Sequence, residues 1–126
     1  MREIEFRGQN INGHWAHGNL AIIKEKLDRA EIGAYISNSA GAPFAYQVRP
    51  ETIGQYTGLK DKNGKKIFEG DVGWDEHNEC YGVVKFEEGK FLYVWENIAE
   101  DLWEVADSIE IYGNIHENPE LLEGTE

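Results

Sequence analysis

The chain has 126 residues, of which 40% are hydrophobic and 12% aromatic, so it is too apolar for a disordered segment and long enough to bury the core of a domain. Its formal net charge is −12, which disfavours direct binding to DNA or RNA because their phosphates would repel it. A single cysteine excludes an intramolecular disulfide, which fits a reducing cytosol, and the apolar stretches are too short for a membrane span or a signal peptide.

The first part of the chain predicts β-strands joined by tight turns. Residues 3–7 alternate between charged and apolar side chains, as in a strand with one buried face. Asn12-Gly13 is a strong hairpin signal, because both central residues of a type I′ turn need a positive φ, and residues 15–23 then form the returning strand. Residues 20–31 combine helical spacing with good helix formers, so they favour either a short helix or a polar loop.

The middle of the chain carries the strongest turn signals. Strands are expected on both sides of a turn cluster at residues 37–41, and a short strand is expected at 53–56. Asn63-Gly64 predicts a second tight turn. Gly70 predicts a positive φ or a bulge at the entry to the next strand.

The remainder of the chain predicts a meander of strands at residues 81–86, 91–96 and 109–116. Residues 98–105, between the last two strands, fit a helical turn or a short strand. Asn118-Pro119 is typical of an N-cap followed by proline at the first helical position, which predicts one final helical turn.

Three segments of the chain carry a resemblance to a known family. Residues 1–8 resemble its start, residues 51–72 (ETIGQYTGLKDKNGKKIFEGDV) its central signature, and residues 111–122 (IYGNIHENPELL) its end. The chain thus resembles the YopX family, which phages and prophages of bacteria encode, while residues 20–50 and 73–108 match only loosely. The resemblance implies a β-rich fold with an SH3-like barrel toward the C-terminus and expression in the bacterial cytoplasm. It implies no activity and no catalytic residues, because the family has no assigned biochemical function.

Pattern and resemblance together predict a mainly β chain. Residues 1–50 are expected to form a β-rich N-terminal subdomain, with at most one short helix, packed on a small SH3-like barrel of residues 51–122. Residues 123–126 are expected to fray. We interpret the central signature as architectural; the alternative is that its loop presents charged side chains to a partner, namely Lys60, Asp61, Lys62, Lys65 and Lys66.

The sequence offers little support for a metal site or a catalytic site. His14, His17, His77 and Cys80 match zinc ligands by type, but the first two are three residues apart and would point to opposite faces of a strand. Carboxylates crowd the segment Glu69–Glu79, yet no EF-hand pattern accompanies them. Nucleophile-elbow, phosphate-loop and dinucleotide motifs are missing from the sequence. We therefore expect no enzyme activity, no cofactor and no stoichiometric metal.

The remaining candidates are surface features. Residues 67–126 hold 17 Asp/Glu against 2 Lys/Arg, whereas residues 1–66 hold 7 against 10. Such a field raises the on-rate of a basic partner; the alternative is that it confers only solubility. Because burying an unpaired carboxylate is costly, all 13 acids between Glu69 and Glu110 are expected to stay in water. The candidate interaction surface comprises Glu100, Asp101, Glu104, Trp74, Trp103, Lys60, Lys62 and Lys65.

Two functional hypotheses follow, and an uncharacterised enzyme is a third, weaker one. The first is a non-catalytic accessory or regulatory phage protein that acts on an unknown protein partner. The second is an acidic decoy that mimics nucleic acid and occupies a nucleic-acid-binding protein of the host. We also expect a homo-oligomer, because strand edges and the opposite charges of the two halves favour self-association, although the net charge opposes it. No membrane partner is expected.

Overall fold

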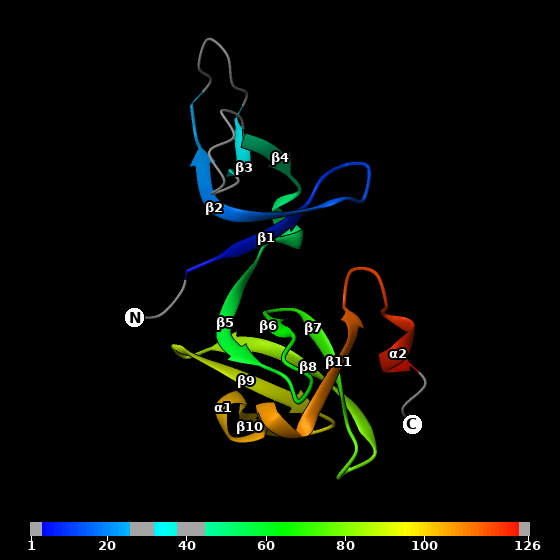
Figure 1. Ribbon diagram of the computed structural model, residues 1–126. Helices are drawn as coiled ribbons and strands as arrows, with labels where there is room; N and C mark the ends of the chain where they lie inside the picture. Colours follow the sequence, from blue (N-terminus) through cyan, green and yellow to red (C-terminus); the bar gives the residue numbers. More distant parts are fainter. Residues whose placement is uncertain (1–3, 26–31, 38–44, 124–126) are drawn as a thin grey trace. The chain divides into compact units, whose positions relative to one another are not determined.

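The computed structural model describes residues 4–25, 32–37 and 45–123. They form two antiparallel sheets with a few short helices, so the prediction of a mainly β chain is confirmed (Figure 1). The chain divides into two compact units, residues 1–56 and residues 57–126. This division falls inside a strand, whereas the sequence suggested a boundary after residue 50.

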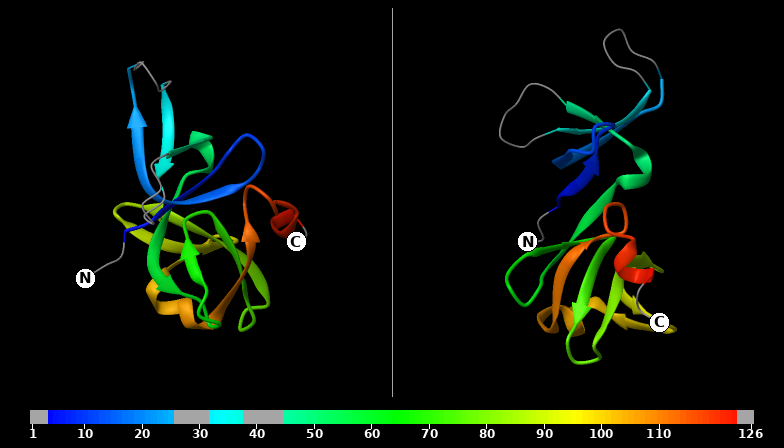
Figure 2. Two further views of the ribbon diagram at one scale, coloured as in Figure 1. Left: turned by 45° about the horizontal axis from the view of Figure 1, so that its top comes forward. Right: turned by 90° about the vertical axis from the view of Figure 1, so that its right-hand side faces the viewer.

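The first unit is built around a long, bent strand, β2. Its first half pairs with β1, where Phe6 faces Gly18, and its second half pairs with β3, where Leu20 faces Ile36. Two views show β2 continuing from one neighbour to the other (Figure 1, Figure 2). The elements are β1 (Phe6–Gln9), β2 (Trp15–Ile23), β3 (Gly33–Ser37), β4 (Ala45–Val48), the 3-10 turn η1 (Pro50–Thr52) and the first residues of β5 (Gly54–Lys60), in the sheet order β4-β3-β2-β1-β5.

The returning strand predicted for residues 15–23 is confirmed as β2, so the helix or loop predicted for residues 20–31 is wrong at its start. Leu20 packs with Ile36 and Val48 in the core of this unit, and cross-strand pairing outweighs the helix propensity of the segment. Residues 26–31 lie outside the described part of the chain.

The second unit holds the rest of β5 and a five-stranded sheet. Within the described residues these strands do not close into a barrel. Residues 98–105 were predicted to form a short strand or a helical turn, and they form both, because a short strand leads directly into a helical turn. The predicted final helical turn is also confirmed. The elements are β6 (Lys66–Phe68), β7 (Asp71–Asp75), β8 (Cys80–Glu87), β9 (Lys90–Trp95), β10 (Ile98–Asp101), α1 (Leu102–Val105), the 3-10 turn η2 (Ala106–Ser108), β11 (Ile109–Asn114) and α2 (Glu120–Glu123), with the sheet order β10-β9-β8-β7-β11.

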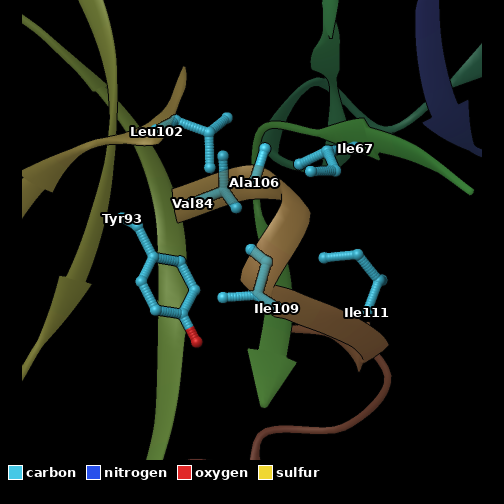
Figure 3. Close-up of a cluster of buried hydrophobic side chains, with 7 residues drawn as sticks. All are labelled: Ile67, Val84, Tyr93, Leu102, Ala106, Ile109 and Ile111. Carbon is cyan, nitrogen blue, oxygen red and sulfur yellow. The ribbon is translucent and has the colours of Figure 1, made fainter. Parts of the chain in front are cut away.

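A hydrophobic cluster fills the space between β6 and the five-stranded sheet. The ring of Tyr93 lies at its edge, and its hydroxyl donates a hydrogen bond of 2.8 Å to the carbonyl oxygen of Gly73 (Figure 3). Gly73 faces Gly82 across β7 and β8, and a Cβ atom on Gly82 would lie 2.5 Å from Cζ of Tyr93. Two facing glycines therefore make the slot that accepts the ring. The buried cluster consists of Ile67, Val84, Tyr93, Leu102, Ala106, Ile109 and Ile111.

The β1–β2 and β5–β6 hairpin turns are stabilised in the same way, by hydrogen bonds from the backbone to one short polar side chain. Oδ1 of Asn10 and Oδ1 of Asp61 each accept hydrogen bonds of 2.8–2.9 Å from the N–H groups two and four residues further on. Both predicted turns are confirmed in position, but the predicted type I′ geometry is wrong. Only the glycine of each Asn-Gly pair has a positive φ, +87° at Gly13 and +83° at Gly64.

The central signature ties the β5–β6 hairpin to β11. Oδ2 of Asp61 accepts a hydrogen bond of 2.8 Å from the N–H of Ile111, and the N–H of Lys62 donates to the carbonyl oxygen of Ile109 at 3.0 Å. Gly70 has the predicted positive φ, +93°, and its N–H donates to the carbonyl oxygen of Val84. These contacts support the architectural interpretation of the signature.

The last family-like segment closes on itself through asparagine side chains. Oδ1 of Asn114 accepts hydrogen bonds of 2.9 Å from the N–H groups of His116 and Glu117. The N–H of Asn118 donates to the carbonyl oxygen of Asn114 at 2.8 Å, immediately before α2 begins. The N–H of Asn114 in turn donates to Oδ1 of Asn118, so the side chains of both asparagines hold the segment after β11.

Candidate functional site

The three acids singled out from the sequence do not form a uniform binding patch. Glu100 accepts a hydrogen bond of 2.8 Å from Nε1 of Trp95, and Asp101 forms an ion pair of 3.0 Å with Nζ of Lys90. Glu104 is exposed on α1. Two of the three carboxylates thus have intramolecular partners, which a charge reversal would remove.

The expectation that every acid between Glu69 and Glu110 stays in water is wrong for Asp71 and Asp75, which are only 2% and 3% exposed. Oδ2 of Asp71 accepts a hydrogen bond of 2.7 Å from the N–H of Phe68. Asp75 accepts hydrogen bonds from the N–H of His77 and from the side-chain amide of Asn78. Backbone and amide donors replace water around both carboxylates, which makes their burial tolerable.

The lysines of the signature loop have different surroundings. Lys60 and Lys65 are exposed, whereas Nζ of Lys62 forms an ion pair of 3.2 Å with Glu76. The loop that carries them is fixed by the buried Asp61 carboxylate.

The two tryptophans predicted to lie near the surface differ as well. Trp103 is 67% exposed on α1. Trp74 is partly buried and belongs to an aromatic cluster with Tyr81 and Tyr112, whose successive ring centroids are 4.8 and 6.0 Å apart in edge-to-face arrangements. Tyr81 and Tyr112 were not predicted from the sequence as surface candidates, although Tyr112 lies in the family-like end of the chain.

This aromatic cluster lies on the outward face of the five-stranded sheet. In the register of the sheet, Trp74 stands between Tyr81 and Glu110. On the other face, Ile111 belongs to the core and the Cβ position of Gly73 faces Tyr93. Tyr112 is 51% exposed. The exposed ring of Tyr112 and the carboxylate of Glu110 therefore lie on the same outward face of the five-stranded sheet.

The cluster belongs to the unit that carries the whole net charge. Residues 57–126 hold 18 Asp/Glu against 6 Lys/Arg, whereas residues 1–56 hold 6 against 6. The first unit is formally neutral and the second has a charge of −12.

His14 and His17 both line one cavity in the first unit, as do the two residues between them, so the divergence of the two imidazoles stays a prediction. His14 precedes β2 and so does not follow the alternation of the strand. His77 and Cys80 belong to the second unit. Within the described ranges, the side chains of His, Cys, Asp and Glu nowhere gather in threes at a distance suited to a metal ion.

Cys80 is expected to be a slow nucleophile. Burial raises the pKa of its thiol, and the carboxylates of Asp75, Glu96 and Glu100 raise it further. A smaller thiolate fraction at mildly alkaline pH should make alkylation by iodoacetamide slower than that of glutathione, with a rate that keeps rising as the pH increases. Mass spectrometry of the alkylated chain over time gives the rate, and a rate equal to that of glutathione at every pH would contradict the prediction.

None of the helices in the described part of the chain combines the length and the apolar composition needed to cross a membrane. No curated protein matches the chain.

Comparison with solved structures finds the crystal structure of protein EF1440 from Enterococcus faecalis, which is 24% identical, with a TM-score of 0.60 over 97% of this chain and 99% of that one. This likeness concerns the fold. The family model described as YopX protein matches residues 5–123, nearly the whole chain. The protein is therefore a member of the YopX family.

Proposed function

We propose that this protein is a non-catalytic binding module, an accessory protein of a phage or prophage that acts in the bacterial cytoplasm by holding a basic segment of a partner protein. The observation that carries the proposal is the outward aromatic cluster of Trp74, Tyr81 and Tyr112 in the unit with a charge of −12. The phage origin and the location rest on the resemblance of residues 51–72 to the family signature.

The surroundings of the cluster suit an Arg or Lys side chain. A cation over an aromatic ring gains about 0.5–2 kcal/mol, depending on how far it is desolvated. Glu110 stands beside Trp74 in the register of the sheet and supplies a carboxylate next to the rings. The net charge of the unit raises the local concentration of a basic segment before it docks.

The acidic decoy remains the alternative, and it makes a different prediction. A decoy binds through charge alone, so its affinity depends on salt and not on one aromatic ring. The proposed module depends on both.

Replacing Tyr112 by alanine is expected to weaken the binding of a nona-arginine peptide about fivefold, because the exposed ring contributes cation–π stabilisation. Tyr112 contacts the cluster only at its edge, so the fold should persist. Fluorescence anisotropy of a labelled peptide at two salt concentrations measures the loss. The matched control is Tyr46→Ala, which removes a similarly exposed ring from the neutral unit and should leave the affinity unchanged.

A charge variant separates the two hypotheses further. Glu104→Lys changes an exposed carboxylate, whereas a triple reversal with Glu100 and Asp101 would also break contacts to Trp95 and Lys90. If Glu104→Lys weakens binding while Tyr112→Ala has no effect, charge alone accounts for the affinity and the proposal fails. If the peptide does not bind at all, the proposal also fails.

A further inference from the structure

One carboxylate on the outward face of the five-stranded sheet is partly shielded from water without being paired. Glu110 is partly buried, and within the described residues its side chain has neither a hydrogen bond nor an ion pair. Other shielded acids of the second unit do have such partners, namely Asp61, Asp71, Asp75, Glu100 and Asp101. A carboxylate that has lost part of its water and gained no donor is suited to an incoming cation.

The neighbours of Glu110 on this face are aromatic. Glu110 lies directly opposite Trp74 across β7 and β11, and the Cβ atoms of such a pair are about 4.5–5.5 Å apart. Tyr112 follows two residues along β11, and the contact of its ring with Tyr81, which pairs with Trp74, places it on the same face. The carboxylate is therefore bordered by one partly buried ring and one exposed ring.

A metal ion does not suit this position, because nowhere in the described part of the chain do three His, Cys, Asp or Glu side chains gather closely enough to hold one. Two lysines of the second unit are engaged with other acids, since Lys62 pairs with Glu76 and Lys90 with Asp101. The charge of the carboxylate and the rings beside it instead suit an organic cation that a partner supplies.

Arginine and lysine would use this position differently. A guanidinium is planar, so it can lie against an aromatic ring and donate two parallel N–H groups to one carboxylate. It is also more weakly hydrated than an ammonium group, so bringing it to a partly buried carboxylate costs less free energy. A lysine ammonium is a strongly hydrated point charge without a flat face to lay on a ring. The position should therefore favour arginine.

We propose that the basic segment of the partner contains an arginine whose guanidinium lies against the rings of Trp74 and Tyr112 and donates a pair of hydrogen bonds to Glu110. This selection rests on the proposed function, since it names the residue that the outward aromatic cluster prefers. A segment with lysine alone would be attracted by the charge of the unit but would lack the paired hydrogen bonds.

Nona-arginine and nona-lysine peptides carry the same charge, so their affinities for the intact chain test this selection. Nona-arginine is expected to bind about tenfold more tightly, the difference that one additional charge-assisted hydrogen bond produces. Fluorescence anisotropy of the labelled peptides at one salt concentration measures both affinities. Equal affinities would overturn the selection of arginine but not the proposed function, provided that Tyr112→Ala still weakens binding. If neither peptide binds, both proposals fail.

Glu110→Gln tests the carboxylate itself. The amide keeps the shape of the side chain, and no described residue bonds to the carboxylate, so the fold should persist, which urea unfolding verifies. The preference for nona-arginine should fall to about twofold, because contact with the rings remains while the paired hydrogen bonds are lost.

The matched control is Glu87→Gln, which removes the same charge from an exposed side chain at the far end of β8. It should leave the preference for nona-arginine unchanged. A preference that persists in Glu110→Gln, or that falls equally in both variants, would overturn the role of Glu110 without touching the proposal of a basic segment.

Discussion

Gly82→Ala is expected to destabilise the second unit by about 3 kcal/mol or more, the upper end of what overpacking a core costs. The added methyl group would lie 2.5 Å from Cζ of Tyr93 and 2.7 Å from Cε2, closer than carbon atoms approach without contact strain. The ring cannot retreat freely, because its hydroxyl is bonded to Gly73 and it lies within the core. Urea unfolding followed by tryptophan fluorescence measures the change in the free energy of unfolding.

Two further variants show whether the clash is the cause. Gly64→Ala places a methyl group where no atom lies within 4 Å, so it reports only the strain of a positive φ, about 1 kcal/mol. Combining Gly82→Ala with Tyr93→Leu should cost less than the sum of the two single changes, because the smaller side chain vacates the slot. Additive losses would show that the ring and the glycine are not coupled.

Asp61→Ala is expected to cost about 3 kcal/mol of stability. The carboxylate accepts hydrogen bonds from the N–H groups of Asn63, Lys65 and Ile111, and it is only 5% exposed. Alanine would leave these donors without an acceptor, and an unsatisfied donor costs roughly 1–3 kcal/mol when buried. Asp61→Asn is the milder comparison because it keeps one acceptor oxygen, and urea unfolding of both variants measures the difference.

The same carboxylate should make the stability depend on pH in the acid range. Burial acts to raise the pKa of Asp61, but hydrogen bonds from Ile111, Lys65 and Asn63, with the charge of Lys65, outweigh it and lower the pKa. A lowered pKa in the folded state means that the stabilisation is complete above the ordinary value near 4 and is lost as the pH falls through the folded value. Asp61→Asn should therefore flatten the fall in stability below about pH 4, and an unchanged slope would contradict this.

Local signals predicted the strands and the positions of the turns well. Alternating side chains and Asn-Gly pairs are properties of neighbouring residues, and β9, β11 and both hairpin turns follow them. The alternation at residues 3–7 was misleading, because β1 spans Phe6–Gln9 and Ile4 is exposed. Residues 20–23 carried two conflicting predictions, a returning strand and a helix or loop, and pairing with β3 decides for the strand. The turn type was missed because it depends on side chains of Asn10 and Asp61 that precede each Asn-Gly pair.

The candidate sites were harder to predict, because they depend on contacts between strands. Trp74 could be named as a surface candidate, but Tyr81 and Tyr112 join it only through the register of β7 with β8 and β11. The carboxylates of Asp71 and Asp75 looked like members of a solvated acidic surface. Their burial becomes intelligible only when the N–H donors around them are known.

The turn that Asn10 holds together also offers a place for a chemical label. The hydrogen bonds of this turn join the side chain of Asn10 to the backbone N–H groups of Asn12 and His14. Ile11 takes no part in these bonds, and it is 87% exposed. A cysteine at position 11 would be far more accessible than Cys80, which is partly buried and carries a raised pKa. A fluorophore could then be attached selectively at the turn without disturbing the bonds that shape it.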